Sequence, residues 1–354
     1  MNSSQTYIAI PPGETIKEQL SFRSMSQKEF AVRMGLSEKH VTNLLKGRVQ
    51  LTSNVAMRLE SVLGAPAVFW ENLEALYREA LIKVEEENQI ATDAEIAKKL
   101  PYSEMVKYGW IHSSKTNYEK VSTLRKFFEV STLRLINNPA VSRIACRRLS
   151  SSDFSNYALI AWAQKAKLDA RNVETKPINI NGLANAVPII RALSTVTAEI
   201  FCPKLTKLFS DNGIALIFLP HLKDSTIQGA SFYDGKKIVV GLTVHERYTD
   251  TFWFSLFHEV AHIIYGHIGQ ASGTSETDEK DADDFARETL IPSEMLKSFV
   301  QAGIFTSDTL TQFAEQLGIE VGILVGRLQH DGVIKCNRFN NLKSQYDLGE
   351  KDND

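Results

Sequence analysis

The sequence has few of the features of a secreted or membrane-bound protein. Its three cysteines, Cys146, Cys202 and Cys336, are far apart and form no CxxC pair, which argues against a disulfide framework and against a zinc site built from thiolates. No run reaches the roughly 18 apolar residues that a membrane helix needs, and the polar N-terminus lacks a basic and apolar signal segment. These absences predict a soluble cytoplasmic protein without a membrane partner.

An excess of charge of one sign is also missing. The chain has 40 Lys and Arg residues against 42 Asp and Glu residues, a net charge of −2, which excludes a globally basic, histone-like nucleic-acid binder. Any contact with DNA must therefore come from a local patch. With 43% hydrophobic and 23% charged residues, the 354-residue chain has an ordinary globular composition, and its length predicts two or three domains.

Three short helices are predicted in the N-terminal part by a capping residue before each helix and a glycine after it. The capping residues are Ser26, Ser37 and Thr52, and the glycines are Gly35, Gly47 and Gly64. Ser26 and Glu29 have the spacing of a capping box. Residues 27–46 have the spacing of a helix-turn-helix, in which Ala31 lies at the helix crossing, Gly35 permits the left-handed turn, and the wedge is filled by Leu36, Val41 and Leu44.

The side chains that the second helix of this segment directs outward are polar types suited to base edges and phosphates, and so are those at the start of the first helix and just beyond the second. The candidate DNA contacts are Gln27, Ser37, Glu38, Lys39, His40, Thr42, Asn43, Lys46 and Arg48. Five basic residues against two acids give residues 27–48 a charge of +3, which is the local patch that the whole-chain total conceals. We predict binding to double-stranded operator DNA. The alternative is a helix-turn-helix that serves only packing or dimerisation.

This segment resembles the Xre/Cro-type helix-turn-helix and, more narrowly, the HigA-type antitoxins. The resemblance spans about residues 10–80 and pairs the helix-turn-helix with the trailing stretch PAVFWENLEALY. It implies an all-α DNA-binding domain over residues 1–82, a homodimer on a two-fold operator, and a helix from Ser37 to Leu45 in the major groove. The protein partner is predicted to be either a protein substrate or a toxin.

A helical connector is predicted over residues 83–209. The charged stretch 81–101 is expected to form a long solvated helix or linker, with Thr92 to Glu95 as a new capping box. Beyond it, apolar residues recur at helical spacing without recognisable chemistry. A small basic cluster in this region is interpreted as a solvated helix face rather than a phosphate site, and consists of Arg143, Arg147 and Arg148.

A small sheet is predicted next, because the hydrophobic period changes to two. Residues 213–220 form an apolar run, and residues 227–233 and 236–242 flank Asp234-Gly235, a strong hairpin signal. The 236–242 strand is expected at a sheet edge, where an extended peptide could add. Helices follow as far as Leu328, and residues 336–354 are expected to be a flexible tail.

The sequence HEVAH at 258–262 carries the strongest chemical signal in the chain. Its two histidines at i and i+4 leave one helix face and can meet a single metal ion, in apolar surroundings where unpaired imidazoles would be costly. A third ligand is expected from the helix that follows. Ala282 and Ala286 define the packed stripe of that helix, so Glu279 points inward and Asp283 can receive the second ring N–H of a ligand histidine.

Other candidates for the third ligand fit less well. The metzincin pattern requires glycine at 265 and histidine at 268, whereas the chain has Tyr265 and Ile268, so His267 is out of register and is interpreted as a hydrogen-bonding or surface histidine. The remaining acids near Glu279 are interpreted as solvated, and are Glu276, Asp278, Asp281 and Asp284.

Residues 210–335 are predicted to form one domain, of which about residues 210–330 resemble the ImmA/IrrE family of zinc metallopeptidases, on the strength of HEVAHIIYGH followed by EKDADDFARETLIP. The resemblance implies an α+β zincin-like domain, Zn²⁺ held by His258, His262 and Glu279, and Glu259 as the catalytic glutamate. Ile291 in place of the usual methionine and Asp281-Ala282-Asp283 in place of the frequent Glu-Ala-Asn are departures, of which Asp283 retains an acceptor. Candidate transition-state donors are Tyr233, His245 and Tyr265.

Together these patterns predict a DNA-binding transcriptional regulator that carries a zinc endopeptidase, whose substrate by resemblance is an Xre-type repressor or the chain itself. One alternative is an antitoxin-like repressor whose peptidase-like domain only senses a ligand or binds a partner. Another is a peptidase whose N-terminal domain only dimerises. A second helix-turn-helix spacing at 313–328 is interpreted as structural, because Arg327 falls where the wedge needs an apolar residue.

Overall fold

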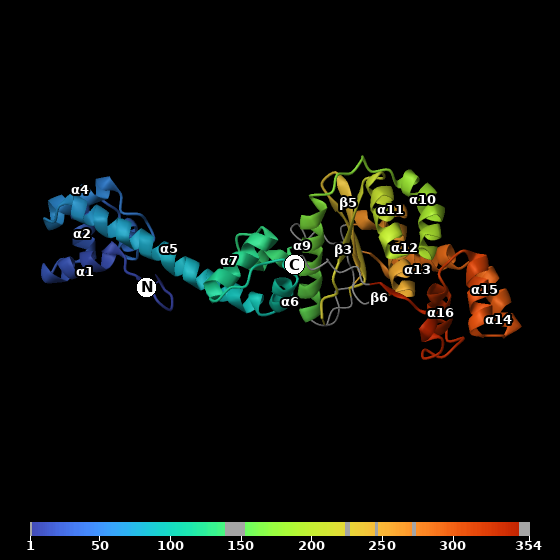
Figure 1. Cartoon of the computed structure of the whole chain (residues 1–354). Helices are drawn as coiled ribbons and strands as arrows, with labels where there is room; N and C mark the ends of the chain where they lie inside the picture. Colours follow the sequence, from blue (N-terminus) through green and yellow to red (C-terminus); the bar gives the residue numbers. More distant parts are fainter. Residues whose placement is uncertain (1, 139–152, 224–226, 245–246, 271–273, 347–354) are drawn as a thin grey trace. The chain divides into compact units, whose positions relative to one another are not determined.

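A computed structural model of the chain describes residues 2–138, 153–223, 227–244, 247–270 and 274–346. The chain divides into two compact units, Met1–Glu95 and Ile96–Asp354 (Figure 1). The basic cluster at 143–148, His245 and the final residues 347–354 lie outside the described residues.

The division falls inside one continuous helix, α5 (Ala67–Ala97), and not near residue 82 as the sequence indicated. The predicted cap at Thr92 is wrong, because the Thr92 hydroxyl donates a hydrogen bond to the Asn88 carbonyl one turn earlier in the same helix, at 2.9 Å. A threonine bonded in this way is satisfied without ending the helix. The change of composition after Arg78 therefore marks an exposed part of α5 and not a domain boundary.

The N-terminal unit is a helical domain with a short antiparallel pair of strands, β1 (Asn2–Ser3) and β2 (Ile8–Ala9). Its first four helices are α1 (Pro12–Phe22), α2 (Gln27–Met34), α3 (Glu38–Leu45) and α4 (Ser53–Leu63). Their core includes the fully buried side chains of Phe30, Met34, Leu59 and Trp70. The predicted starts of α2, α3 and α4 are confirmed, since the side chains of Ser26, Ser37 and Thr52 each accept a hydrogen bond from the N–H three residues later.

The C-terminal unit combines helices with one three-stranded sheet. Its α-helices after α5 are α6 (Tyr102–Lys107), α7 (Asn117–Phe128), α9 (Asp153–Ala170), α10 (Ile180–Ala192), α11 (Ala198–Ser210), α12 (Thr249–Ile264), α13 (Glu276–Leu290), α14 (Ser293–Ala302), α15 (Ser307–Leu317) and α16 (Val321–His330). Short 3₁₀ helices are η1 (Leu133–Asn137), η2 (Leu193–Thr195), η3 (His267–Gly269) and η4 (Asn340–Leu342).

The sheet has the strand order β3-β5-β4, with β3 (Ile214–Leu219) parallel and β4 (Gly229–Asp234) antiparallel to the central β5 (Lys237–Thr243). The predicted hairpin is confirmed, and its turn consists of Gly235 and Lys236, because Asp234 pairs with Lys237. Gly235 has a φ of 62°, which glycine adopts without strain. The prediction that the 236–242 strand lies at an edge is wrong, since β5 is paired on both sides.

Both faces of the sheet are covered by helices, α9 on one and α11 and α12 on the other (Figure 1). The alternation of side chains along β3 explains the two layers: Ala215 and Ile217 belong to the cluster around Trp162 of α9, whereas Ile214 and Leu216 belong to the larger core. Gly241 of β5 is required for the close approach of α9, because a Cβ atom there would lie 2.6 Å from the Trp162 ring.

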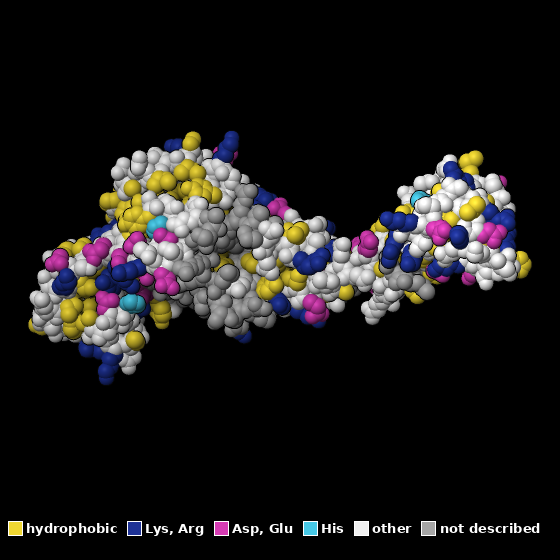
Figure 2. All heavy atoms as spheres, turned by 180° about the vertical axis from the view of Figure 1, so that it is seen from behind, with side chains coloured by type: hydrophobic (Ala, Val, Ile, Leu, Met, Phe, Trp, Pro, Cys, Tyr) yellow, Lys and Arg dark blue, Asp and Glu magenta, His cyan; other side chains and the backbone are white. Residues whose placement is uncertain are grey.

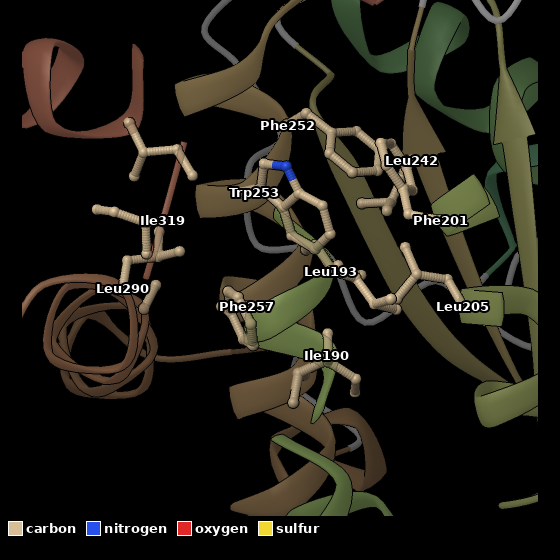
Figure 3. Close-up of a cluster of buried hydrophobic side chains, with 14 of the residues drawn as sticks. Ile190, Leu193, Phe201, Leu205, Leu242, Phe252, Trp253, Phe257, Leu290 and Ile319 are labelled. Atoms are coloured by element: carbon tan, nitrogen blue, oxygen red, sulfur yellow. The ribbon is translucent and has the colours of Figure 1, made fainter. Parts of the chain in front are cut away.

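The larger core draws on α10 to α13 and on the helices that follow (Figure 3). Phe252, Trp253 and Phe257 of α12 pack with Phe201 of α11, and the rings of Phe201 and Trp253 meet edge to face at 5.1 Å. The sequence assigned residues 83–209 to a connector, but α9, α10 and α11 are layers of the C-terminal unit. The helical periodicity of residues 153–210 predicts that each helix buries one face, but it does not identify the sheet or helices that cover that face.

The prediction of a flexible tail from residue 336 is wrong for residues up to 346. Strand β7 (Gln345–Tyr346) pairs with β6 (Arg247–Tyr248), the segment that leads into α12. Tyr346 is buried, and its hydroxyl accepts a hydrogen bond from Nε1 of Trp253 at 3.0 Å. Lys343 forms an ion pair with Asp250 in the first turn of α12 at 2.7 Å. We call residues 343–346 the C-terminal strap.

The described helices include none that is both long and apolar enough to cross a membrane. Cys202 is half-buried and Cys336 is exposed, and neither belongs to a disulfide. Cys146 lies outside the described residues.

Candidate metal centre and helix-turn-helix surface

Helix α12 presents both histidines of the HEVAH segment to one point. The Nε2 atoms of His258 and His262 are 3.0 Å apart, and the side chains are 15% and 6% exposed. Glu279 of α13 completes the group, with Oε2 3.4 Å from Nε2 of His258 and Oε1 3.6 Å from Nε2 of His262. One ligand atom from each of the three residues lies within 4.8 Å of the others. Two imidazoles and a carboxylate facing one point form a donor set that suits Zn²⁺.

The outer atoms of these residues also have partners. Nδ1 of His258 is 2.9 Å from Oδ1 of Asp283, as the sequence predicted for the residue one turn after Glu279. The Thr274 hydroxyl donates to Oε1 of Glu279 at 2.6 Å. Such contacts fix the orientation of a ligand side chain before any ion binds.

His267 is buried and hydrogen-bonded, so of the two predicted alternatives the surface histidine is excluded. Its Nδ1 lies 3.0 Å from Nδ1 of His262, and its Nε2 lies 3.4 Å from Oδ1 of Asp278. Gly266, with a φ of 76°, turns the chain so that His267 comes back against α12. The sequence interpretation placed Asp278 among the solvated acids and gave Thr274 no role. Sequence spacing does not show the contact of Asp278 with His267 or that of Thr274 with Glu279, because both form only once the chain folds back after α12.

The two facing imidazoles have pKa values displaced in opposite directions. Burial alone lowers the pKa of His258, but hydrogen bonds to Asp283 and Glu279 outweigh that effect and raise it to about 9. Burial, followed by repulsion from His258, lowers the pKa of His262 to about 4. The hydrogen bond from His258 lowers the pKa of Glu279 to about 2. The group therefore holds a carboxylate, one imidazolium and one neutral imidazole at neutral pH.

Glu259 lies beside this group and against the sheet. Its side chain is 6% exposed, and a Cβ atom built on Gly229, the first residue of β4, would lie 3.0 Å from its Cγ and Oε1. Glycine at 229 is thus what leaves room for the Glu259 carboxylate between α12 and β4. Among the described residues β4 pairs with no strand on its other side, so β4 and not β5 is the sheet edge next to the histidines.

The candidate transition-state donors have different surroundings. Tyr233 lies near the end of β4 and is 37% exposed. Tyr265 is half-exposed and its ring meets Phe285 edge to face at 5.8 Å. His245 lies outside the described residues.

In the N-terminal unit, α2 and α3 have the packing that the helix-turn-helix spacing predicts. Ala31, Val41 and Leu44 are buried, Leu36 packs against the same core, and Gly35 has a φ of 64°. Of the candidate DNA contacts, His40, Thr42 and Asn43 are half-buried, and the exposed ones are Gln27, Ser37, Glu38, Lys39, Lys46 and Arg48. The Thr42 hydroxyl donates to the Glu38 carbonyl at 2.9 Å, so it is already engaged within the helix.

The charge of +3 on residues 27–48 is carried by unpaired cations. Glu29 does not close the predicted capping box with Ser26, because its carboxylate pairs with Arg33 at 2.7 Å. Within the described part of the chain, the four other cations of this segment form no ion pair, and they are Lys28, Lys39, Lys46 and Arg48. Dark-blue Lys and Arg side chains recur over the visible face of the N-terminal unit (Figure 2).

The second helix-turn-helix spacing belongs to α15 and α16. Ala314 is buried and Gly318 has a φ of 67°, as the spacing indicates. Both helices contribute side chains to the main core, and Arg327 pairs with Asp331 at 2.6 Å. These contacts agree with a structural role for this helix pair.

The similarities found to known proteins lie in the N-terminal region of this chain. Over 63 residues the chain is 35% identical to YddM, an uncharacterized HTH-type transcriptional regulator of Escherichia coli (strain K12), a match that spans 18% of this chain and 67% of that protein. It is also similar to the structure of an addiction module antidote protein of a HigA family from Coxiella burnetii, at 29% identity and a TM-score of 0.22, covering 24% of this chain and 92% of that one. No protein-family model matches.

The fold and exposed surface of α2 and α3 define a helix-turn-helix domain. Through this domain the chain belongs to the family of HTH-type transcriptional regulators.

Proposed function

We propose that this chain is a DNA-binding transcriptional regulator whose C-terminal unit is a zinc-dependent endopeptidase. The observation that carries the second half of the proposal is the convergence of His258, His262 and Glu279 within 4.8 Å, with Glu259 on the same helix. The unpaired cations on and beside α3 support the first half. In this proposal the substrate is an Xre-type repressor or the chain itself, so that cleavage would change transcription.

The residues fit Zn²⁺ through the chemistry of their donors and the support around them. When bound, zinc would supply a Lewis acid that polarises a peptide carbonyl and lowers the pKa of water. His258, His262 and Glu279 would hold it. Asp283 and Thr274 would keep the ring of His258 and the carboxylate of Glu279 in place, as their contacts at 2.9 Å and 2.6 Å indicate.

Glu259 would act as the general base and then as the general acid. Its carboxylate would accept a proton from the attacking water and pass that proton to the amine that leaves as the peptide bond breaks. Burial between α12 and Gly229 keeps this carboxylate from swinging into solvent. It is also consistent with a role in chemistry rather than in surface solvation.

Strand β4 supports an endopeptidase, since an extended peptide could add to its open edge. The N–H of Thr243 donates to the Gln228 carbonyl, so alternate β4 residues face β5 and the backbone groups of Gly229, Ser231 and Tyr233 face the open edge. Replacing Ser231 by proline would remove an outward N–H without removing a bond to β5. We expect weaker peptide cleavage with zinc content unchanged, measured by steady-state kinetics and metal analysis. Undiminished cleavage would exclude binding at this edge.

The peptidase half is tested by incubating the zinc-loaded full-length protein with purified Xre-type repressors and, separately, with itself. Mass spectrometry would identify new peptide ends, and the Glu259→Gln variant would be run in parallel. We expect fragments that the variant does not produce. Absence of cleavage in every mixture, with DNA binding intact, would favour an antitoxin-like repressor whose C-terminal unit senses a ligand or binds a partner such as a toxin.

DNA binding is tested with the full-length protein and duplexes selected from a random-sequence pool. Replacing both Lys46 and Arg48 by alanine is expected to weaken binding to all selected duplexes and to reduce the slope of log K against log salt by about two, since each phosphate contact contributes about 0.9. Lys83→Ala is the matched control, because Lys83 is paired with Glu79 on α5. An unchanged salt slope, measured by fluorescence anisotropy, would argue for a helix-turn-helix that only packs or dimerises. Recovery of two-fold symmetric duplexes would support a homodimer.

A further inference from the structure

The two histidines of the candidate metal centre are supported in different ways. His258 is held by one carboxylate, since Asp283 contacts its Nδ1 directly. His262 is held through a chain of two residues: its Nδ1 contacts Nδ1 of His267, and Nε2 of His267 approaches Oδ1 of Asp278. We call the chain from Asp278 through His267 to His262 the His262 relay.

The contacts of the His262 relay favour one arrangement of protons when its rings are neutral. A carboxylate accepts hydrogen bonds, so Asp278 favours the form of His267 that carries its proton on Nε2. Nδ1 of His267 is then an acceptor, and the 3.0 Å contact requires His262 to donate from its own Nδ1. A neutral imidazole protonated on Nδ1 has its lone pair on Nε2, the atom that faces His258 and Glu279.

Burial stabilises this arrangement of protons. The side chains of His262, His267 and Asp278 are 6%, 9% and 16% exposed, so water competes little for the ring nitrogens. Asp278 is itself fixed, because its other oxygen, Oδ2, accepts the backbone N–H of Ser275 at 2.6 Å in the cap of α13. The Asp278 carboxylate therefore has two roles. It caps the N-terminus of α13, the helix that carries Glu279, and it orients His267, which in turn contacts His262.

We propose that His267 and Asp278 are positioning residues that select the Nδ1–H form of His262 and so direct its Nε2 lone pair toward the metal position. The consequence for metal binding rests on the proposed zinc site. The proton arrangement does not rest on it, since it follows from contacts within the chain.

The Asp278→Asn change is expected to reverse the donor and acceptor roles along the His262 relay while preserving the hydrogen bond that caps α13. The Ser275 N–H needs an acceptor, so the amide oxygen takes the place of Oδ2 and the amide NH₂ faces His267. His267 then accepts at Nε2, carries its proton on Nδ1, and forces His262 to accept at Nδ1 and to protonate Nε2. Asp281→Asn is the matched control, because Asp281 is an exposed acid of the same helix.

Long-range ¹H–¹⁵N spectra of metal-free, full-length protein labelled at histidine would report the tautomer of His262. We expect the Nδ1–H form in the unmodified protein and in Asp281→Asn, and a substantial Nε2–H population in Asp278→Asn. An Nε2–H tautomer in the unmodified protein, or an unchanged tautomer in Asp278→Asn, would overturn the proposal. This result does not depend on whether the protein is a peptidase.

Chelator competition provides the second measurement. The Asp278→Asn change is expected to lower zinc affinity about 10- to 100-fold, the usual effect of losing a residue that orients a ligand histidine. In a His267→Asn background the same change should have little effect, because the link between Asp278 and His262 is already cut. Equal losses in both backgrounds would indicate a general structural role for Asp278 and contradict the relay. A protein that binds no zinc while showing the expected tautomers would refute the zinc site alone.

Discussion

Replacement of Glu259 by glutamine is expected to lower the rate of peptide cleavage by about 10²- to 10⁴-fold, the usual contribution of a general acid or base. Glutamine has nearly the same shape, so it can occupy the space that Gly229 leaves beside α12. It cannot accept the proton of the attacking water. Because the three candidate ligands are untouched, zinc content should remain that of the unmodified protein.

The measurement for Glu259→Gln is steady-state cleavage of a peptide found in the repressor or self-cleavage mixtures, together with metal analysis of the same samples. Glu276→Gln is a suitable control, since Glu276 is an exposed acid in the first turn of α13. Cleavage by Glu259→Gln at the unmodified rate would assign the reaction to a contaminating peptidase or to another residue.

The second large effect is expected from Glu279→Ala, which should reduce zinc affinity more than the 10- to 100-fold typical of losing a supporting residue. The change leaves two imidazoles without the carboxylate that approaches both. The hydrogen bond from His258 lowers the pKa of Glu279 to about 2, so the unmodified side chain is an ionised carboxylate throughout the pH range of an assay.

Competition with a chelator of known affinity would measure the effect of Glu279→Ala. The matched control is Asp284→Ala, which removes an exposed carboxylate five residues further along the same helix. Equal zinc affinity in the Glu279→Ala and unmodified proteins would show that Glu279 does not bind the ion. A loss shared by the Asp284→Ala control would point to a general dependence on the charge of α13.

The features that the sequence predicted correctly depend on short spacings. His258 and His262 are four residues apart on one helix, so their convergence follows from helix geometry alone. The packing of α2 against α3 likewise depends on residues close together in the sequence, namely Ala31, Gly35 and Val41. Glu279 required one further inference, since it lies on the next helix. The stripe of Ala282 and Ala286, both fully buried, was enough to orient it.

The features that the sequence did not predict depend on contacts between distant segments. The order of the strands places β5 in the centre, which no local pattern in residues 236–242 can indicate. Trp162 packs against Gly241, so α9 belongs with the sheet although the sequence shows only a helix with an apolar face. Asp278 contacts His267 only because Gly266 turns the chain back after α12, and no pattern in residues 276–284 distinguishes Asp278 from the solvated acids of that segment.

The C-terminal strap has a consequence for how the C-terminal unit can be produced as a separate protein. A fragment ending at residue 335, the limit that the sequence pattern indicated, would lack Tyr346, whose ring packs against Phe201 and Phe252. It would leave an aromatic surface open to water at the start of the helix that carries the histidines, and such surfaces promote aggregation. A fragment beginning at residue 210 would in addition lack α9, α10 and α11. Recombinant fragments should therefore extend from residue 96 to at least Tyr346.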